Sequence, residues 1–214
     1  MAGASETSGH NALFKMTPEG MRIRNSQDVA ILLRGLDVAD QQSHVEHLLR
    51  LTAVDRRSRF HSAMGDEALR IYSRNLDWRN AIIFGVFVDG TLRGVGELMP
   101  LRGGAEGEIS ISIEDAFQHG GIGRILIAAL VIAARRAGME AVRMLYFRDN
   151  DGMRQLSRSI GASSTMSSGV MEGVLSLAAQ DNAREPATAV SPMKRLFMER
   201  RGPSVVPNTS PATA

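Results

Sequence analysis

Residues 113–124 read IEDAFQHGGIGR and mark a passage from a strand to a helix. At the start of this stretch and just before it, Ile109, Ile111 and Ile113 alternate with polar residues. This alternation is typical of a strand with one buried face. After the three glycines, residues 125–134 are all apolar and predict a helix over 123–137 that ends at Gly138. The pattern therefore predicts a strand, a glycine-rich turn and a long helix in succession.

A turn of this kind can bind an anion. The first N–H groups of a helix have no partner within the helix, and together with the helix dipole they attract negative charge. Glycines let a phosphate approach the backbone closely, so the turn suits a pyrophosphate. Two other phosphate-binding patterns do not fit, because the chain has neither G-x-x-x-x-G-K-[ST] nor G-x-G-x-x-G with an acidic residue about twenty positions later.

The segment from Gln118 to Gly123 matches the Q/R-x-x-G-x-G/A signature, and on it the chain resembles the GNAT family of N-acetyltransferases. The following helix and strand, Asn150 with its helix, and Ser159 to Ala162 are also similar to that family. The resemblance covers about residues 20–177 and is most specific over 108–162. Within the family, the segment looks most like the acetyltransferase domains of bacterial protein-lysine acetyltransferases.

The rest of the chain predicts an α+β fold, which the resemblance identifies as the GNAT acyl-CoA N-acyltransferase fold, with a mixed, largely antiparallel sheet flanked by helices and with disordered tails. We expect a flexible arm over 1–19, one domain over 20–177 and a disordered tail over 178–214, which is rich in Ala, Pro, Ser and Thr. Asp89-Gly90 is a two-residue hairpin signal between two strands. Helices are expected over 27–36, 42–51, 66–76 and 150–160, and strands over 21–24, 81–88, 91–98, 108–114, 141–147 and within 166–177.

Composition excludes several classes of protein. The chain has 214 residues, 43% of them hydrophobic, and no cysteine, so disulfide scaffolds, cysteine-based zinc sites and a catalytic thiol are ruled out. The net charge is +2 and only 5% of residues are aromatic, which argues against a nucleic-acid binder. The longest apolar run is too short to span a membrane, and no secretory signal is present, so we expect a cytoplasmic protein.

The resemblance implies a set of residues that bind acetyl-CoA as acyl donor. The backbone at the end of the central strand would pair with the pantetheine arm, and the turn with the helix start would hold the pyrophosphate. Asn150 would hydrogen-bond the cofactor arm, although it also suits a helix N-cap. The residues implied are Ile111, Ser112, Ile113, Gln118, His119, Gly120, Gly121, Ile122, Gly123, Arg124 and Asn150.

Transfer of an acyl group to an amine needs a base, because the amine must lose a proton. Glu108 matches the family's glutamate on this strand and follows a polar loop, and Glu97 is the second candidate. Many family members have a tyrosine where this chain has Ser157, so the proton donor to the leaving thiolate is open between Ser157, Tyr146 and water. The structural alternative for Glu108 is a solvated carboxylate at a strand end.

Two groups of side chains have plainer interpretations. His44 and His47, with His61 further along, do not show a recurring metal-ligand spacing, so no metal is expected. Arg56, Arg57 and Arg59 are interpreted as a solvated helix end, with an acidic partner or the cofactor's 3′-phosphate as the alternative.

The sequence therefore predicts an acetyl-CoA-dependent N-acetyltransferase whose acceptor is a primary amine: a protein lysine, a protein N-terminus or a small molecule. The alternative is a catalytically weak acyl-CoA-binding regulatory module. No nucleic acid or membrane partner is expected, and a homodimer stays open. The sequence does not indicate which amine is the acceptor or which acyl chain is preferred.

Overall fold

In the computed structural model, which describes residues 14–17 and 20–177, nine strands form one mixed sheet in the order β1-β2-β3-β4-β5-β6-β7-β9-β8. Within these residues the pairing of β6 with β7 is parallel and every other pairing is antiparallel. The strands are β1 (Phe14–Thr17), β2 (Gly20–Arg24), β3 (Ala30–Leu36), β4 (Ile82–Val88), β5 (Thr91–Pro100), β6 (Glu106–Ile113), β7 (Ala141–Phe147), β8 (Ser163–Ser167) and β9 (Val170–Ser176).

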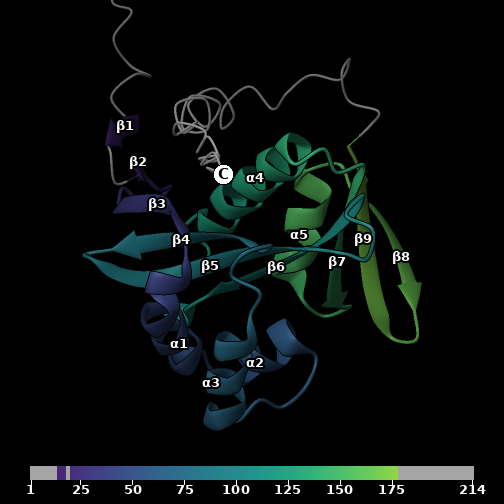
Figure 1. Cartoon of the computed structure of the whole chain (residues 1–214), viewed down its shortest axis with the longest axis horizontal. Coiled ribbons are helices and arrows are strands. Elements are labelled where there is room, and N and C mark those ends of the chain that lie inside the picture. Colours follow the sequence, from purple (N-terminus) through teal and green to yellow (C-terminus); the bar gives the residue numbers. More distant parts are fainter. Residues whose placement is uncertain (1–13, 18–19, 178–214) are drawn as a thin grey trace, which may run out of the picture.

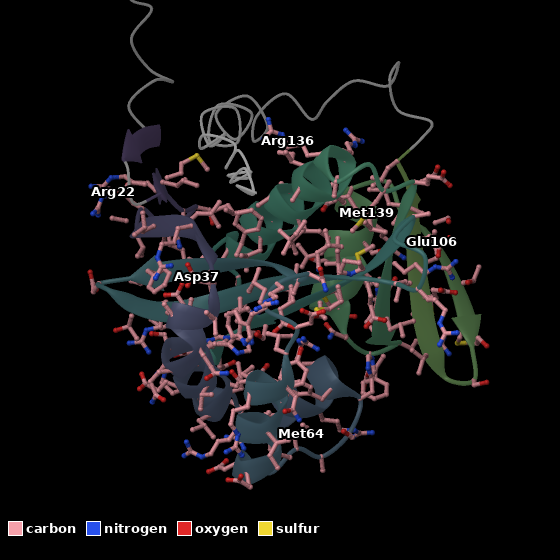
Figure 2. All side chains as sticks on the ribbon, viewed as in Figure 1. Arg22, Asp37, Met64, Glu106, Arg136 and Met139 are labelled. Carbon is pink, nitrogen blue, oxygen red and sulfur yellow. The ribbon has the colours of Figure 1, made fainter. Side chains whose placement is uncertain are left out.

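Helices cover both faces of this sheet (Figure 1). The helices α1 (Gln41–Arg50), α2 (Ala53–Phe60) and α3 (Asp66–Asn75) lie on one face, and α4 (Ile122–Arg136) and α5 (Asp151–Ser159) lie on the other. Figure 2 shows side chains filling the space between the sheet and each helical layer. The α+β fold with a mixed, largely antiparallel sheet flanked by helices is confirmed.

The helix α4 packs closely on the middle of the sheet. Three of its own side chains, Leu126, Ile127 and Leu130, are fully buried. A Cβ at Gly96 of β5 would lie 2.9 Å from a methyl carbon of Leu130, so glycine at this position permits the close approach. This packing fixes the start of α4 over the end of β6, where the glycine-rich turn lies.

Several local predictions are confirmed. The β4–β5 hairpin turns at Asp89 and Gly90, whose φ angles of 48° and 76° are both positive, as a type I′ turn requires. The predicted strand over 141–147 has the bounds of β7, and the predicted helices over 42–51, 66–76, 123–137 and 150–160 differ from α1, α3, α4 and α5 by one residue at most at either end. The strands predicted within 166–177 are β8 and β9, although β8 begins three residues earlier, at Ser163.

The helix predicted over residues 27–36 is wrong, because this segment contains the strand β3 between β2 and β4. Ile31 and Leu33 face the core under α4, and Leu32 packs on the opposite cluster. A strand covered on both faces has no polar alternation, so its apolar residues also fit a helical period. Ser26, which precedes this segment, lies in the β2–β3 turn.

Part of the predicted N-terminal arm is also a strand. Residues 14–17 form β1 and pair antiparallel with β2. The segment 178–214, predicted as a disordered tail, lies outside the described residues, so that expectation stays a prediction.

Candidate functional site

A cavity of about 830 Å³ opens where β6 and β7 separate. The parallel pairing of these strands joins Glu106–Glu108 to Ala141–Arg143 only. Beyond it, the end of β6 faces the cavity together with Leu145 of β7, and the other walls come from α2, α4, α5 and β2 with the turn that follows it. Ten of the eleven residues predicted to bind the cofactor line this cavity: Ile111, Ser112, Ile113, Gln118, His119, Gly120, Gly121, Gly123, Arg124 and Asn150.

The glycine-rich turn forms the wall of the cavity at the start of α4. Gly121 has a φ of 84°, in the region that favours glycine, and it is the residue before the first turn of the helix. The N–H groups of Ile122 and Gly123 lie in that first turn, where no preceding helical turn supplies a carbonyl oxygen to accept their hydrogen bonds. They and the positive end of the helix dipole give the turn its affinity for an anion.

Ile122 is the one predicted residue that does not line the cavity. Its side chain is 1% exposed and packs in the core, where it would contact a Cβ placed on Gly94. Only its backbone can take part in binding.

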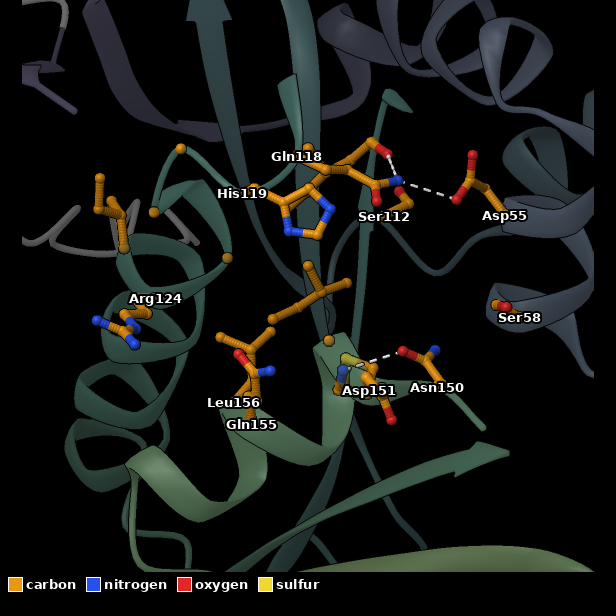
Figure 3. A pocket seen from close by; sticks show the side chains of 18 of the residues that line it. Asp55, Ser58, Ser112, Gln118, His119, Arg124, Asn150, Asp151, Gln155 and Leu156 are labelled. Atoms are coloured by element: carbon orange, nitrogen blue, oxygen red, sulfur yellow. Dashed lines mark hydrogen bonds between the residues drawn. The ribbon is translucent and has the colours of Figure 1, made fainter. Parts of the chain in front are cut away.

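Gln118 braces the turn with its side chain (Figure 3). Its Nε2 group donates to Asp55 Oδ1 at 2.9 Å and to the carbonyl oxygen of Ile113 at 3.1 Å. The amide thus ties the start of α2 to the end of β6. Gln118 was predicted to hold the pyrophosphate, whereas its side chain joins two walls of the cavity.

Asn150 begins α5 beside the cavity (Figure 3). Its Oδ1 atom accepts a hydrogen bond from the N–H group of Met153 at 3.0 Å, which is an N-cap. Within the described residues no side-chain or backbone acceptor is bonded to its Nδ2 group. Asn150 can therefore cap the helix and still offer a donor to a ligand.

Glu108 lies on β6, two residues before Ser110, which lines the cavity. Its side chain is half-buried, and no hydrogen bond to it is found within the described part of the chain. Its negative charge is near enough to Arg59 to help raise the pKa of that guanidinium, although burial opposes the rise. Glu108 does not itself line the cavity, and within the described residues its carboxylate has no fixed hydrogen-bond partner.

Glu97 has a different environment. Its carboxylate is 1% exposed, accepts hydrogen bonds from His44 and Arg59, at 3.0 Å and 2.6 Å, and contacts the Tyr72 hydroxyl. Burial alone would raise the pKa of Glu97, but the charge of Arg59 and these hydrogen bonds lower it to about 2. A carboxylate so held takes up a proton poorly and does not line the cavity, which disfavours Glu97 as the base.

Ser157 is not brought to the cavity. Its side chain is fully buried, and its hydroxyl lies 3.4 Å from that of Ser164 in β8 and against Gly173 in β9. Tyr146, the substitute considered for it, is also buried and bonds Ser164 at 2.9 Å. The position of Ser157 in α5 turns it toward the last two strands, and neither Ser157 nor Tyr146 lines the cavity.

A buried network around His47 and Glu114 was not predicted from the sequence. Glu114 directly follows β6, is 6% exposed and accepts hydrogen bonds from Arg50 and Arg93, each at 2.8 Å. His47 lies 3.3 Å from Glu114 and 2.9 Å from Ser112. The spacing of His44 and His47 on the apolar face of α1 was the one signal for it.

The arginine cluster is not a solvated helix end throughout. Arg59 turns inward to Glu97 and lines the cavity, and Arg56 donates to the carbonyl oxygens of Leu49 and Leu51. Arg57 is exposed and lies over the ring of Phe147 at 5.3 Å. Within residues 14–17 and 20–177, no group of three His, Cys, Asp or Glu side chains has the arrangement of a metal site.

No helix in the described part of the chain combines the length and the apolar composition needed to cross a membrane.

Comparison with known families gives one match, to the acetyltransferase (GNAT) family over residues 46–161, which is more than half of the chain. No curated protein is recognisably similar to the chain in sequence.

Solved structures of similar fold include the GNAT domain of the S. lividans protein PAT, with a TM-score of 0.64 and 13% identity over 79% of this chain and 100% of that one. YncA, a putative acetyltransferase from Salmonella typhimurium solved with acetyl-CoA, has a TM-score of 0.53 and 17% identity, covering 73% and 98% of the two chains. A spermidine N-acetyltransferase from Vibrio cholerae, in complex with CoA and spermine, has a TM-score of 0.54 and 17% identity, covering 68% and 95%. At these identities the likeness shows the fold.

Proposed function

Because this chain belongs to the acetyltransferase (GNAT) family, we propose that it transfers the acetyl group of acetyl-CoA to a primary amine. The acceptor would be a protein lysine, a protein N-terminus or a small molecule. The observation that carries the proposal is the cavity between the separated ends of β6 and β7, which ends at the glycine-rich turn. It joins an anion-binding turn to an open strand edge in one continuous space.

The open edge of β6 supports the placement of the pantetheine arm. The N–H group of Glu114 donates to the Arg93 carbonyl at 3.0 Å, so Glu114 directs its backbone toward β5. The Ile113 carbonyl accepts from Gln118 and therefore points to the other side. Successive residues of a strand point their backbone N–H and C=O groups to opposite sides. Ile111 and Ile113 therefore direct these groups toward the gap left by β7. An amide-containing arm can pair there.

The charge of the site suits the other end of the donor. The turn before α4 offers unpaired N–H groups for the pyrophosphate, and Arg124 adds a positive charge at the rim. The acetyl group would then lie toward Ser110 and Glu108, further back along β6.

In the proposed reaction Glu108 accepts a proton from the acceptor amine. The amine nitrogen then forms a bond to the thioester carbon, and the carbon–sulfur bond breaks to release CoA thiolate. A backbone N–H group on the open edge of β6 can stabilise the oxyanion that forms. The proton that the attacking nitrogen still has to lose passes through water to the thiolate, since Ser157 and Tyr146 are buried away from the cavity.

That last observation favours the alternative of a catalytically weak acyl-CoA-binding module. The discriminating experiment measures free thiol released from acetyl-CoA with a panel of small amines, polyamines and lysine peptides. An acetyltransferase releases thiol faster when its acceptor is present and yields an acetylated amine of the matching mass. Binding of acetyl-CoA by calorimetry, with no acetylated product across the panel, would instead support the binding module.

A further inference from the structure

Ser112, His47 and Glu114 form a hydrogen-bonded row that ends at the cavity. Ser112 Oγ lies 2.9 Å from Nε2 of His47, and Nδ1 of the same ring lies 3.3 Å from Glu114 Oε1. The serine comes from β6, the histidine from α1, and the glutamate directly follows β6. A hydroxyl, an imidazole and a carboxylate in this order are the arrangement that activates a serine nucleophile.

The direction of each hydrogen bond follows from the chemistry of the groups. Arg50 and Arg93 hold Glu114 as a carboxylate, which can only accept, so Nδ1 of His47 carries the hydrogen. Burial lowers the pKa of His47, despite the opposing effect of Glu114, and favours a neutral ring. Nε2 of a neutral ring with a protonated Nδ1 is an acceptor. The Ser112 hydroxyl therefore donates to His47, as a nucleophile must to its base.

The chain contains a second row of the same kind that has no access to the cavity. Ser73 Oγ lies 2.9 Å from Nδ1 of His44, whose Nε2 lies 3.0 Å from Glu97. Ser73 is fully buried and does not line the cavity, whereas Ser112 does. Both rows fix α1 to its neighbours, but only the Ser112 row contains a serine that lines the cavity. The Ser73 row is thus a matched control.

Donors for an oxyanion lie on both sides of Ser112. The backbone N–H groups of Ile111 and Ile113 face the gap beside β7, and both residues line the same cavity. A thioester carbonyl along this edge would meet an N–H donor and the Ser112 hydroxyl together, which is the requirement for attack on an acyl group.

We propose that Ser112 is a nucleophile that hydrolyses bound acyl-CoA when no amine is present, through an acyl-serine. This inference rests on the proposed function only in that the cavity holds acyl-CoA. Ser112 Oγ forms a bond to the thioester carbon and its proton passes to His47 Nε2. The carbon–sulfur bond breaks, and the CoA thiolate takes that proton.

Water then attacks the acyl-serine and gives its proton to His47. The ester bond breaks, the proton returns to Ser112 Oγ, and the carboxylic acid leaves as a carboxylate after losing its proton to solvent. Arg50 and Arg93 share the negative charge of Glu114, which weakens its stabilisation of a protonated His47. We therefore expect this hydrolysis to be slow beside transfer to an amine.

The test uses two readouts on the full chain. A fluorophosphonate probe should attach to Ser112, located by mass spectrometry of peptides, and thiol release from acetyl-CoA without amine should show a Ser112-dependent rate. Ser112→Ala should abolish labelling and lower the amine-free rate by about 10²-fold or more, as expected for loss of a nucleophile and its base. Ser73→Ala should keep both, and near-wild-type melting of each variant shows that the fold is intact.

The outcomes separate this inference from the proposed function. Amine-free thiol release that persists in Ser112→Ala, or the absence of labelling in the wild type, overturns the inference whether or not an amine is acetylated. Labelling and hydrolysis that depend on Ser112 support it even when no amine of the panel is acetylated. Equal loss in Ser73→Ala would show that the rows act by packing alone, and would overturn the inference as well.

Discussion

Arg59 of α2 donates to Glu97 of β5 across 2.6 Å, between side chains that are 11% and 1% exposed. This ion pair anchors α2 against the sheet while another face of Arg59 lines the cavity. The carboxylate that the sequence offered as a second base is therefore a structural group. Its other partners, His44 and Tyr72, come from α1 and α3, so Glu97 connects all three helices of that face.

Replacing Glu97 should therefore destabilise the fold more than it alters chemistry. Glu97→Gln leaves the Arg59 charge without its partner, and the loss of one member of a buried pair costs about 3–5 kcal/mol. Urea unfolding should show this loss in the free energy of unfolding. Glu106→Gln, which removes an ion pair with Arg143 between side chains 39% and 37% exposed, is the control and should change stability far less. Similar stability of the two variants would contradict the role given to Glu97.

Stability should also fall in acid over a defined range. The pKa of Glu97 is lowered from 4.5 to about 2, chiefly because Arg59 overcomes the effect of burial. A carboxyl whose pKa is lower in the folded state contributes stability that is fully present above 4.5 and is lost as the pH falls toward about 2. The pKa of Glu114 is lowered to about 2 as well and adds to the effect. The measurement is the free energy of unfolding as a function of pH, and a flat profile below pH 4.5 would refute the prediction.

Gly121→Glu should abolish acetyl-CoA binding while the fold survives. The substitution places bulk and negative charge at the turn proposed for the pyrophosphate. Any side chain at the φ of 84° is strained, by about 1–3 kcal/mol, so Gly121→Gln serves as the control for strain and bulk. Calorimetry should show weaker binding for the glutamate than for the glutamine variant. Unchanged affinity in a folded Gly121→Glu protein would remove the turn from the binding site.

Glu108→Gln should lower turnover near neutral pH by about 10²–10⁴-fold, the usual contribution of a general base. Acetyl-CoA affinity should barely change, because the proposed contacts with the donor lie further along β6 and in the turn. The defect should shrink at high pH, where more of the acceptor amine is already free of its proton. Glu106→Gln, on the same strand, should retain turnover. Near-normal turnover of Glu108→Gln across the pH range would exclude Glu108 as the base.

Asn150 allows its two roles to be separated by a pair of variants. Asn150→Asp keeps an N-cap acceptor for Met153 but loses the Nδ2 donor, so stability should hold while acetyl-CoA affinity falls. Asn150→Ala loses both, and the missing cap should cost about 1 kcal/mol in the free energy of unfolding. Thermal unfolding and calorimetry measure the two effects. Equal acetyl-CoA affinity of Asn150→Asp and the wild type would leave Asn150 a cap only.

Much of the fold was predictable because its signals are local. The alternating isoleucines of β6, the apolar run of α4 and the Asp89-Gly90 turn each express one period or one backbone requirement within a few residues. The glycine-rich turn was predictable for the same reason, since its anion-binding property belongs to the start of a helix. Ten of the residues predicted around it do line one cavity.

The local sequence pattern could not decide which distant segment each strand, helix or side chain contacts. Residues 30–36 carry a spacing that fits a helix or a doubly covered strand, and pairing with β2 and β4 chose the strand. Glu97 and Glu114 look like solvated carboxylates until α1 and α2 bring His44, His47, Arg50 and Arg59 onto them. Ser157 sits where a family motif expects an acid, yet packing against β8 and β9 buries it. The sequence alone determined the strand, turn and helix of the binding loop, because neighbouring residues suffice for them. Burial and ion pairing across the sheet were decided by tertiary structure, because they join residues tens of positions apart in the chain.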